Sequence, residues 1–287
     1  MCLRTLLAAC VHLARRGGTI IKEVHREGRL GAHNKKADGD MRAAQAMEPQ
    51  EVLTIADTRA QDAIASSLRG MFPGIRLVGE EDEDTGGKEV LTRLDEVPPL
   101  PASFEPPPAL AESVTLADTC IWIDPLDGTI EFVRNNLHHV CVLIGVAVRD
   151  RPVAGVVHQP FVGGEEGTVT YGALDAGVFG DLAPAWGGPP EQLKLAMELK
   201  HTTNPRVKAA VASVEGAGEP KVSQGCGQNL LKVLRGETSA FVQAAGASRW
   251  DTCAGQALLE AVGGKVTDLD GQPYAYTQGL ASYVNDR

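Results

Sequence analysis

Several absences limit what this sequence of 287 residues can be. A membrane span needs an apolar run of about 18 residues, and no run in this sequence approaches that length, so no membrane partner is expected. The six cysteines form no C-x-x-C pair, which predicts scattered buried thiols in a reducing compartment. The residues after Met1 lack a long apolar h-region and a small-residue cleavage site. A cytoplasmic location is therefore expected.

Positive charge is also scarce, because 27 lysines and arginines stand against 37 aspartates and glutamates, a formal net charge of -10. A nucleic-acid backbone is therefore not expected as a partner. A small phosphorylated substrate remains compatible with this charge if metal ions lie between it and the protein. The sequence shows no internal repeat and no heptad run, and the chain is expected to act as a monomer.

The composition is that of an ordinary globular protein, with 43% hydrophobic and 22% charged residues. The length allows one large domain or two moderate ones. The mixture of helical and strand patterns predicts an α+β N-terminal domain, residues 1–157. It also predicts an α/β C-terminal domain, residues 158–287.

Hydrophobic periodicity predicts several helices. Residues 3–27 carry apolar side chains at helical spacing, with a break expected at Gly17-Gly18. A second helix is expected to open at Asp57 and to end before Phe72. Residues 251–262 predict a late helix that Gly263-Gly264 closes.

Strand patterns lie between these helices. Residues 140–148 and 153–157 predict two strands joined by a hairpin turn. Residues 28–50 predict a flexible loop or an exposed strand pair, and residues 265–268 a last strand. The proline-rich segment 84–118 is expected to be a surface excursion rather than part of the core.

An Asp-rich motif, Trp-Ile-Asp-Pro-Leu-Asp-Gly-Thr, occupies residues 122–129. Asp124 and Asp127 lie within three residues of each other at the end of an apolar strand. Such carboxylates repel unless a cation lies between them or one takes up a proton. Hard oxygen ligands of this kind suit Mg²⁺, and Thr129 is placed to cap a following helix. Taken alone, the pattern is more typical of a turn with solvated carboxylates.

Further acidic residues lie at the ends of predicted elements. Asp57 lies where a strand meets a helix, Glu80 and Glu81 end another strand, and Asp251 starts a helix. Carboxylates in such places can meet in one cleft. Each alone could also be a helix cap or a solvated loop end.

Together these motifs resemble a known family. Gly79-Glu80-Glu81, Asp124-Pro125-Leu126-Asp127-Gly128-Thr129 and Trp250-Asp251 are similar to the motifs of the inositol monophosphatase superfamily, whose members are magnesium-dependent, lithium-sensitive phosphomonoesterases. The order is the same and the resemblance covers nearly the whole chain. It implies a layered αβαβα, sugar-phosphatase-like fold. Within the superfamily, residues 57–82, 124–160 and 250–254 look most like the 3'(2'),5'-bisphosphate nucleotidases.

The resemblance implies a site for two or three Mg²⁺ ions. Glu80, Asp124 and the backbone carbonyl of Leu126 would hold one ion. Asp124, Asp127 and Asp251 would hold a second, and a third, weaker ion would arrive with substrate.

The resemblance also implies catalytic and phosphate-binding groups. Thr129 and Asp57 would form a hydrogen-bonded pair that takes a proton from the attacking water. Glu81 would contact the metal ligands without binding the ion itself. The backbone amides of Gly128 and Thr129, at a helix start, would bind the substrate phosphate.

The expected substrate wall departs from the family pattern. Gly225-Cys226-Gly227 resembles a glycine segment that lets a nucleotide approach the backbone. Asn229, however, stands where the nucleotidases carry a lysine, and Arg249 or Lys221 would have to compensate for the missing charge. Residues 33–50 look like an insertion compared with the family.

The expected function is removal of the 3'-phosphate of 3'-phosphoadenosine 5'-phosphate, giving AMP. An inositol polyphosphate 1-phosphatase or inositol monophosphatase is an alternative, since it would share the metals and differ in the pocket wall. A non-catalytic phospholigand-binding protein and a structural protein with metal-stabilised loops are weaker alternatives, because neither needs the whole proton-transfer pair.

Overall fold

The structure is a computed structural model that describes residues 1–34, 37–40, 52–81, 91–181, 193–198, 202–216, 218–243, 246–277, 279 and 283. Of the predicted insertion over residues 33–50, the strands β1 (His33–Asn34) and β2 (Ala37–Asp40) are described, and residues 35–36 and 41–50 lie outside the description. β1 pairs with β2 and with β3 (Val52–Leu53), and both pairings are antiparallel. Of the two structures expected for residues 28–50, a loop or a strand pair, the strand pair is confirmed.

The larger sheet has six strands in the order β4-β5-β6-β7-β8-β9. Its strands are β4 (Arg76–Gly79), β5 (Thr119–Asp127), β6 (Cys141–Val148), β7 (Arg151–Gln159), β8 (Thr168–Ala173) and β9 (Gly177–Gly180). β4 is parallel to β5 and every other pairing is antiparallel. All residues of β5 and β6 are buried, because the two strands are covered on both faces. The predicted hairpin between β6 and β7 is confirmed.

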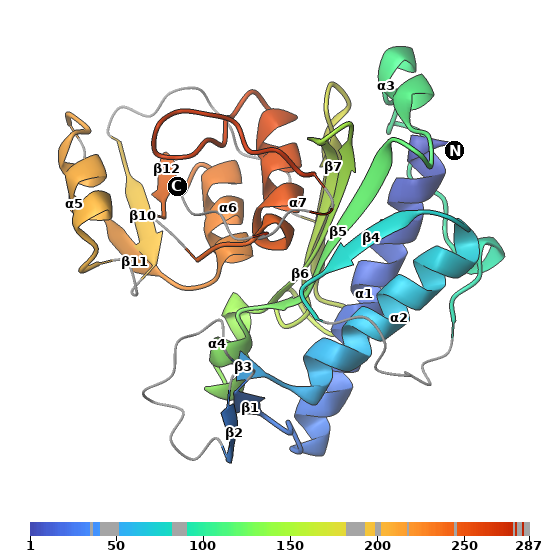
Figure 1. Cartoon of the computed structure of the whole chain (residues 1–287), viewed down its shortest axis with the longest axis horizontal. Coiled ribbons are helices and arrows are strands. Elements are labelled where there is room, and N and C mark those ends of the chain that lie inside the picture. Colours follow the sequence, from blue (N-terminus) through green and yellow to red (C-terminus); the bar gives the residue numbers. More distant parts are fainter. Residues whose placement is uncertain are drawn as a thin grey trace.

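Helices cover both faces of this sheet (Figure 1). α1 (Leu3–Glu27) and α2 (Ile55–Met71) pack on one face, and α7 (Arg249–Glu260) packs on the other. Beyond α7 lie α6 (Cys226–Leu234), the parallel sheet β11 (Lys221–Ser223), β10 (Leu195–Glu198) and β12 (Ala240–Val242), and finally α5 (Pro205–Ala212). The layers thus alternate helix, sheet, helix, sheet, helix, which confirms the predicted αβαβα fold.

No helix in the described ranges combines the length and the apolar character that crossing a membrane would require. The predicted boundary between residues 157 and 158 falls inside β7. The division into two domains stays a prediction.

The expected break in the first helix is wrong, because α1 runs without interruption through Gly17 and Gly18. Both glycines are buried where the helix touches its neighbours. A Cβ atom on Gly17 would lie 3.0 Å from Ile64 of α2, and one on Gly18 would overlap the ring of His158 in β7. The glycines therefore serve close packing rather than a kink.

The proline-rich excursion is more than a surface loop, which corrects that expectation. Leu100 and Phe104 lie in the main core, 6% and 0% exposed, and the Phe104 ring meets Phe179 of β9 edge-on at 5.5 Å. Arg4 of α1 donates to the carbonyls of Leu100 and Pro101 at 2.8 and 2.7 Å. The segment also contains α3 (Pro108–Ser113) and a short 3₁₀ helix, Leu94–Glu96.

The last predicted strand, residues 265–268, is also wrong, since these residues belong to no strand. The Asp268 carboxylate accepts hydrogen bonds from the backbone amides of Asp270 and Gln272 at 2.9 and 2.8 Å. This local side-chain bonding closes a turn in place of sheet pairing.

Candidate active site

The Asp-rich motif forms the end of β5 and the turn that follows it. Asp124 and Asp127 are 1% and 8% exposed, and the register with β6 shifts between them. The amide of Leu126 donates to Asp124 Oδ1 at 3.0 Å, which orients that carboxylate. Gly128 then adopts φ 87°, a left-handed conformation that glycine favours. Thr129 is the first residue of the short helix α4 (Thr129–Val133), whose N-cap is Gly128, so the expectation that Thr129 caps it is wrong.

Thr129 and Asp57 lie in contact although 72 positions separate them. The Thr129 hydroxyl is 3.0 Å from Asp57 Oδ1 and 3.0 Å from the carbonyl oxygen of Leu126. The other oxygen of Asp57 accepts from the amide and the hydroxyl of Thr54, at 2.8 and 2.5 Å. Thr54 is the N-cap of α2, and Asp57 is its third residue rather than its opening one, which corrects the predicted start. This capping box holds the fully buried Asp57 with Oδ1 toward Thr129.

Carboxyl groups from three elements gather beside this pair. Burial raises the pKa of Asp124 well above its usual range, and the charges of Glu80, Asp251 and Asp127 raise it further. Burial and the charges of Glu80 and Asp127 likewise raise the pKa of Asp251. The interaction between the carboxyl groups of Asp124 and Asp251 also raises the pKa of Asp124 and acts against the rise in the pKa of Asp251.

Asp127 is held by the start of α6. Its Oδ1 accepts from the amide of Cys226 at 3.2 Å, and its Oδ2 accepts from the amide of Gly227 at 2.8 Å. Burial raises the pKa of Asp127 to about 7, with Glu198 and Glu80 adding to the rise, while the two amide bonds act in the opposite direction. The glycine segment predicted to approach a nucleotide thus binds this carboxylate with its amides.

The donor set fits a hard divalent cation by its chemistry. It consists of the carboxylates of Glu80, Asp124, Asp127 and Asp251, all oxygen donors whose mutual repulsion a cation would relieve. In the described part of the chain, no three His, Cys, Asp or Glu side chains converge on one point that could hold an ion.

Two residues near the cluster were not predicted from the sequence. Gln61 of α2 donates to the carbonyl of Glu81 at 2.6 Å and accepts from its amide at 3.0 Å, so it fixes the backbone beside Glu80. Glu198, at the end of β10, is 4% exposed and raises the pKa of Asp127 through its charge. A signal for Glu198 existed, since it too is a carboxylate at the end of an apolar strand.

The remaining predicted wall residues are occupied with contacts inside the protein. Asn229 is fully buried, and its amide donates to the carbonyl of Gly225 at 2.9 Å. Arg249 donates through Nε to the carbonyl of Ala275 at 2.8 Å and lies over the ring of Tyr274, 4.9 Å from its centroid. Neither side chain is directed at the carboxylates by these contacts.

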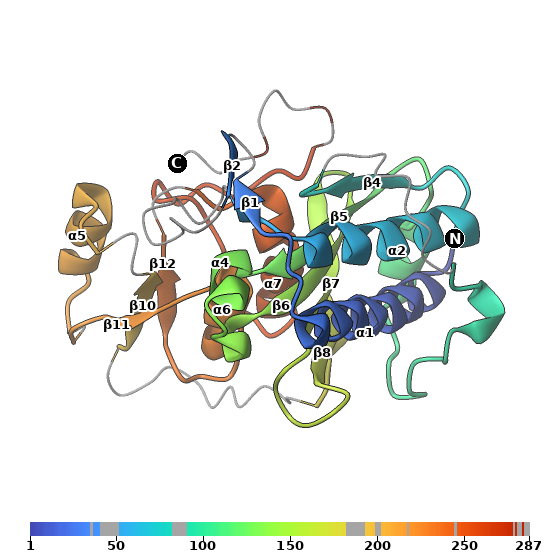
Figure 2. The same ribbon diagram turned by 90° about the horizontal axis from the view of Figure 1, so that it is seen from below.

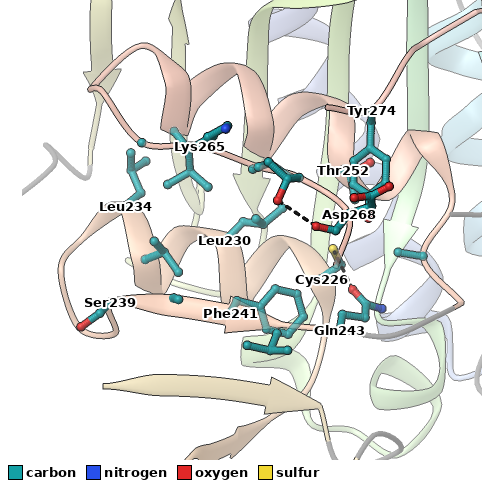
Figure 3. Close-up of a pocket in the computed structure, with 18 of the residues that line it drawn as sticks. Cys226, Leu230, Leu234, Ser239, Phe241, Gln243, Thr252, Lys265, Asp268 and Tyr274 are labelled. Atoms are coloured by element: carbon teal, nitrogen blue, oxygen red, sulfur yellow. Dashed lines mark hydrogen bonds between the residues drawn. The ribbon is translucent and has the colours of Figure 1, made fainter. Parts of the chain in front are cut away.

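A cavity of about 450 Å³ adjoins the cluster, between α6, α7 and β12 (Figure 3). Its walls include the apolar side chains of Leu230, Leu234 and Phe241. Cys226 joins cavity and cluster, because its amide binds Asp127 while its thiol lines the cavity and donates to Gln243 Oε1. The cavity therefore begins next to a residue that holds an active-site carboxylate.

Comparisons with known proteins agree with this geometry. The model of the inositol monophosphatase family matches residues 3–286. A 3'(2'),5'-bisphosphate nucleotidase 1 of Rattus norvegicus is 32% identical over 299 residues, covering 96% of this chain and 86% of the rat protein. Inositol monophosphatase 3 of Xenopus laevis is 29% identical over 286 residues, covering 96% and 75%. Among solved structures, CysQ from Bacteroides thetaiotaomicron superposes with a TM-score of 0.67 at 19% identity, covering 98% of this chain and 95% of that one.

Gly227→Ala is expected to destabilise the protein by about 1–3 kcal/mol, because overpacking forces neighbours to move. Its Cβ atom would lie 2.7 Å from Leu143 and 2.9 Å from Asp127 Oδ2. Gly70→Ala is the matched control, since Gly70 is also helical but has open space around it. The free energy of unfolding of this control should rise by about 0.5–1 kcal/mol, because alanine favours a helix more than glycine does. Urea unfolding measures both changes, and equal effects would show that Gly227 is not tightly packed.

Proposed function

Because the chain belongs to the inositol monophosphatase family and is thus a phosphatase, we propose that it is a Mg²⁺-dependent phosphomonoesterase acting on 3'-phosphoadenosine 5'-phosphate. It would release the 3'-phosphate and leave AMP. The observation that carries the proposal is the buried carboxylate cluster beside the Thr129–Asp57 hydrogen bond.

Glu80, Asp124 and the carbonyl of Leu126 would hold one Mg²⁺, and Asp124, Asp127 and Asp251 a second. When bound, Mg²⁺ supplies the positive charge that neutralises the phosphate and lowers the pKa of a coordinated water. The Thr129 hydroxyl has one hydrogen and two acceptors within 3.0 Å. Donation to Asp57 leaves the Leu126 carbonyl available to the ion.

Thr129 and Asp57 would then act on the attacking water. The hydroxyl oxygen of Thr129 accepts a proton from that water while its own hydrogen moves toward Asp57 Oδ1. Thr54 keeps Asp57 in place for this transfer, since it occupies the opposite carboxylate oxygen. Positioned proton transfer of this kind accelerates a reaction by about 10²- to 10⁴-fold.

The adjoining cavity supports a nucleotide as substrate. Its apolar walls, with Phe241 among them, match the flat faces of a base, and the Gln243 side chain can meet the polar edge of an adenine. An inositol ring carries hydroxyl groups on every carbon and would gain little from such walls. The similarity to the rat 3'(2'),5'-bisphosphate nucleotidase 1 supports this choice.

Glu198 favours an inositol phosphate as the second candidate. Its buried carboxylate next to Asp127 would repel a second phosphate and can accept hydrogen bonds from hydroxyl groups. The lysine that the nucleotidases carry at the position of Asn229 is also missing. Losing one charge-assisted contact weakens binding by about 1.5–3 kcal/mol, so the bisphosphate should have a raised KM and an unimpaired kcat.

A substrate panel tests the choice between the two candidates. At fixed Mg²⁺, 3'-phosphoadenosine 5'-phosphate should be hydrolysed with a higher kcat/KM than inositol 1-phosphate, while EDTA abolishes both activities and millimolar lithium inhibits them. Released phosphate is the measurement. A higher kcat/KM for inositol 1-phosphate would establish the second candidate, and activity that persists in EDTA would refute the metal-dependent mechanism.

Thr129→Ala should lower kcat by about 10²- to 10⁴-fold and leave Mg²⁺ affinity near that of the wild type, because its hydroxyl is assigned to proton transfer and not to the ion. Thr129→Ser keeps the hydroxyl and should retain most of the activity. Calorimetric titration with Mg²⁺ accompanies the kinetics. If Thr129→Ala instead loses Mg²⁺ binding, Thr129 supports the metal ligands and is not the proton-transfer group.

A further inference from the structure

A basic groove of about 950 Å³ runs along the outer face of α1, the helix in the foreground of Figure 2. His12, Arg15, Arg16, Lys22 and Arg26 line it from the helix. Residues of the segment 91–96 form the opposite wall, and Glu165-Glu166, between β7 and β8, forms one end. None of these residues takes part in the carboxylate cluster or its supports.

The cations gather on one face of a helix in a protein whose net charge is -10. Spacings of three, four and seven residues, as between His12, Arg15, Arg16, Lys22 and Arg26, place side chains on the same side of a helix. We call these five side chains the basic strip. Glu23, an acidic residue of the same helix, forms an ion pair with Arg59 of α2 at 3.9 Å and not with the strip. The helix side of the groove is therefore positively charged, while Glu96, Glu165 and Glu166 line its other sides.

The strip is only partly neutralised. Arg15 pairs with Glu166 at 3.3 Å and with Asp181 at 3.7 Å. Arg16 and Arg26 form no ion pair with any residue that the structure describes. The Arg26 charge also contributes, after burial, to a lowered pKa of Lys22, which is the effect of cations that crowd one another.

The loop that closes one end shows what kind of ligand fits. Glu165 and Glu166 stand between glycines in a tight turn, and they place a short acidic backbone segment against the helix. Arg15 takes the carboxylate of Glu166, and Lys22 donates to the backbone carbonyl of Glu165. The groove thus binds both carboxylates and peptide carbonyls.

Beyond Lys22 and Arg26 the groove continues into a smaller cavity of about 260 Å³. Leu137, Pro160 and Phe161 give it an apolar wall. A ligand lying along α1 from His12 to Arg26 would therefore contact positively charged side chains along its length and an apolar pocket beyond Arg26.

We propose that this groove is a docking site for an acidic peptide segment of a partner protein, with carboxylates along Arg16 and Arg26 and an apolar side chain in the pocket at Phe161. From His12 to Arg26 the helix rises about 21 Å, at ~1.5 Å per residue. An extended peptide of about six residues spans this distance. A nucleic acid fits less well, because its negative charge would continue past these cations along a protein whose net charge is -10.

Fluorescence anisotropy with a labelled peptide of about six residues, glutamates followed by a C-terminal phenylalanine, tests the proposal. The full-length protein should bind this peptide and should not bind its glutamine counterpart. The double variant Arg16→Glu, Arg26→Glu should weaken binding at least about tenfold. The control Arg206→Glu, Lys208→Glu makes the same change of charge on the exposed face of α5 and should bind like the wild type.

Hydrolysis of a phosphomonoester and the melting temperature should be the same in both double variants and the wild type, which verifies that they fold. Absence of peptide binding to the wild type would overturn the proposal. Equal weakening in the two double variants would do so too, since it would reflect general charge. Tighter binding of a poly-uridine RNA or of anionic vesicles through Arg16 and Arg26 would show that the strip serves another partner.

Discussion

Repulsion among buried carboxylates is the constraint on which the rest of this site depends. Asp124, Asp127 and Asp251 have raised pKa values, first because they are buried and then because they face one another and Glu80. Like charges out of water are costly without a compensating positive charge. The fold brings them together nonetheless, from the end of β4, the end of β5 and the start of α7. A cation bound among these carboxylates would relieve their repulsion.

The surrounding structure orients several of these acidic residues through hydrogen bonds. Two amides at the start of α6 bind Asp127, the capping box of α2 fixes Asp57, and Gln61 fixes the backbone next to Glu80. Several of these supports join segments that are distant in sequence. The site is therefore a product of layer packing, and small changes in packing at Gly227 reach Asp127 directly.

Local patterns in the sequence predict much of this, and contacts between distant segments account for what they miss. The mixture of helices and strands follows from periodicity, the αβαβα layering from the family resemblance, and the carboxylates stand at element ends as expected. The contact between Thr129 and Asp57 was implied by the resemblance alone. Gln61 could not be recognised, because its role arises from the backbone of Glu81, which only the fold brings next to it. Glu198 carried the signal of a carboxylate at the end of an apolar strand, but its place beside Asp127 comes from the fold. Phe104 looked like part of a proline-rich surface loop, although Phe179 buries it.

The most direct test of the central claim is the melting temperature of the wild type and Asp124→Asn, measured from pH 5 to pH 8 with Mg²⁺ or with EDTA. A carboxyl whose pKa rises on folding stabilises the protein below its unfolded pKa of 3.8 and loses that contribution as pH rises, for Asp127 through about 7. In EDTA, Asp124→Asn should therefore melt increasingly above the wild type as the pH rises. Mg²⁺ should stabilise the wild type at pH 8 and have little effect on the variant. A difference that does not change with pH, or equal stabilisation of both proteins by Mg²⁺, would contradict the account.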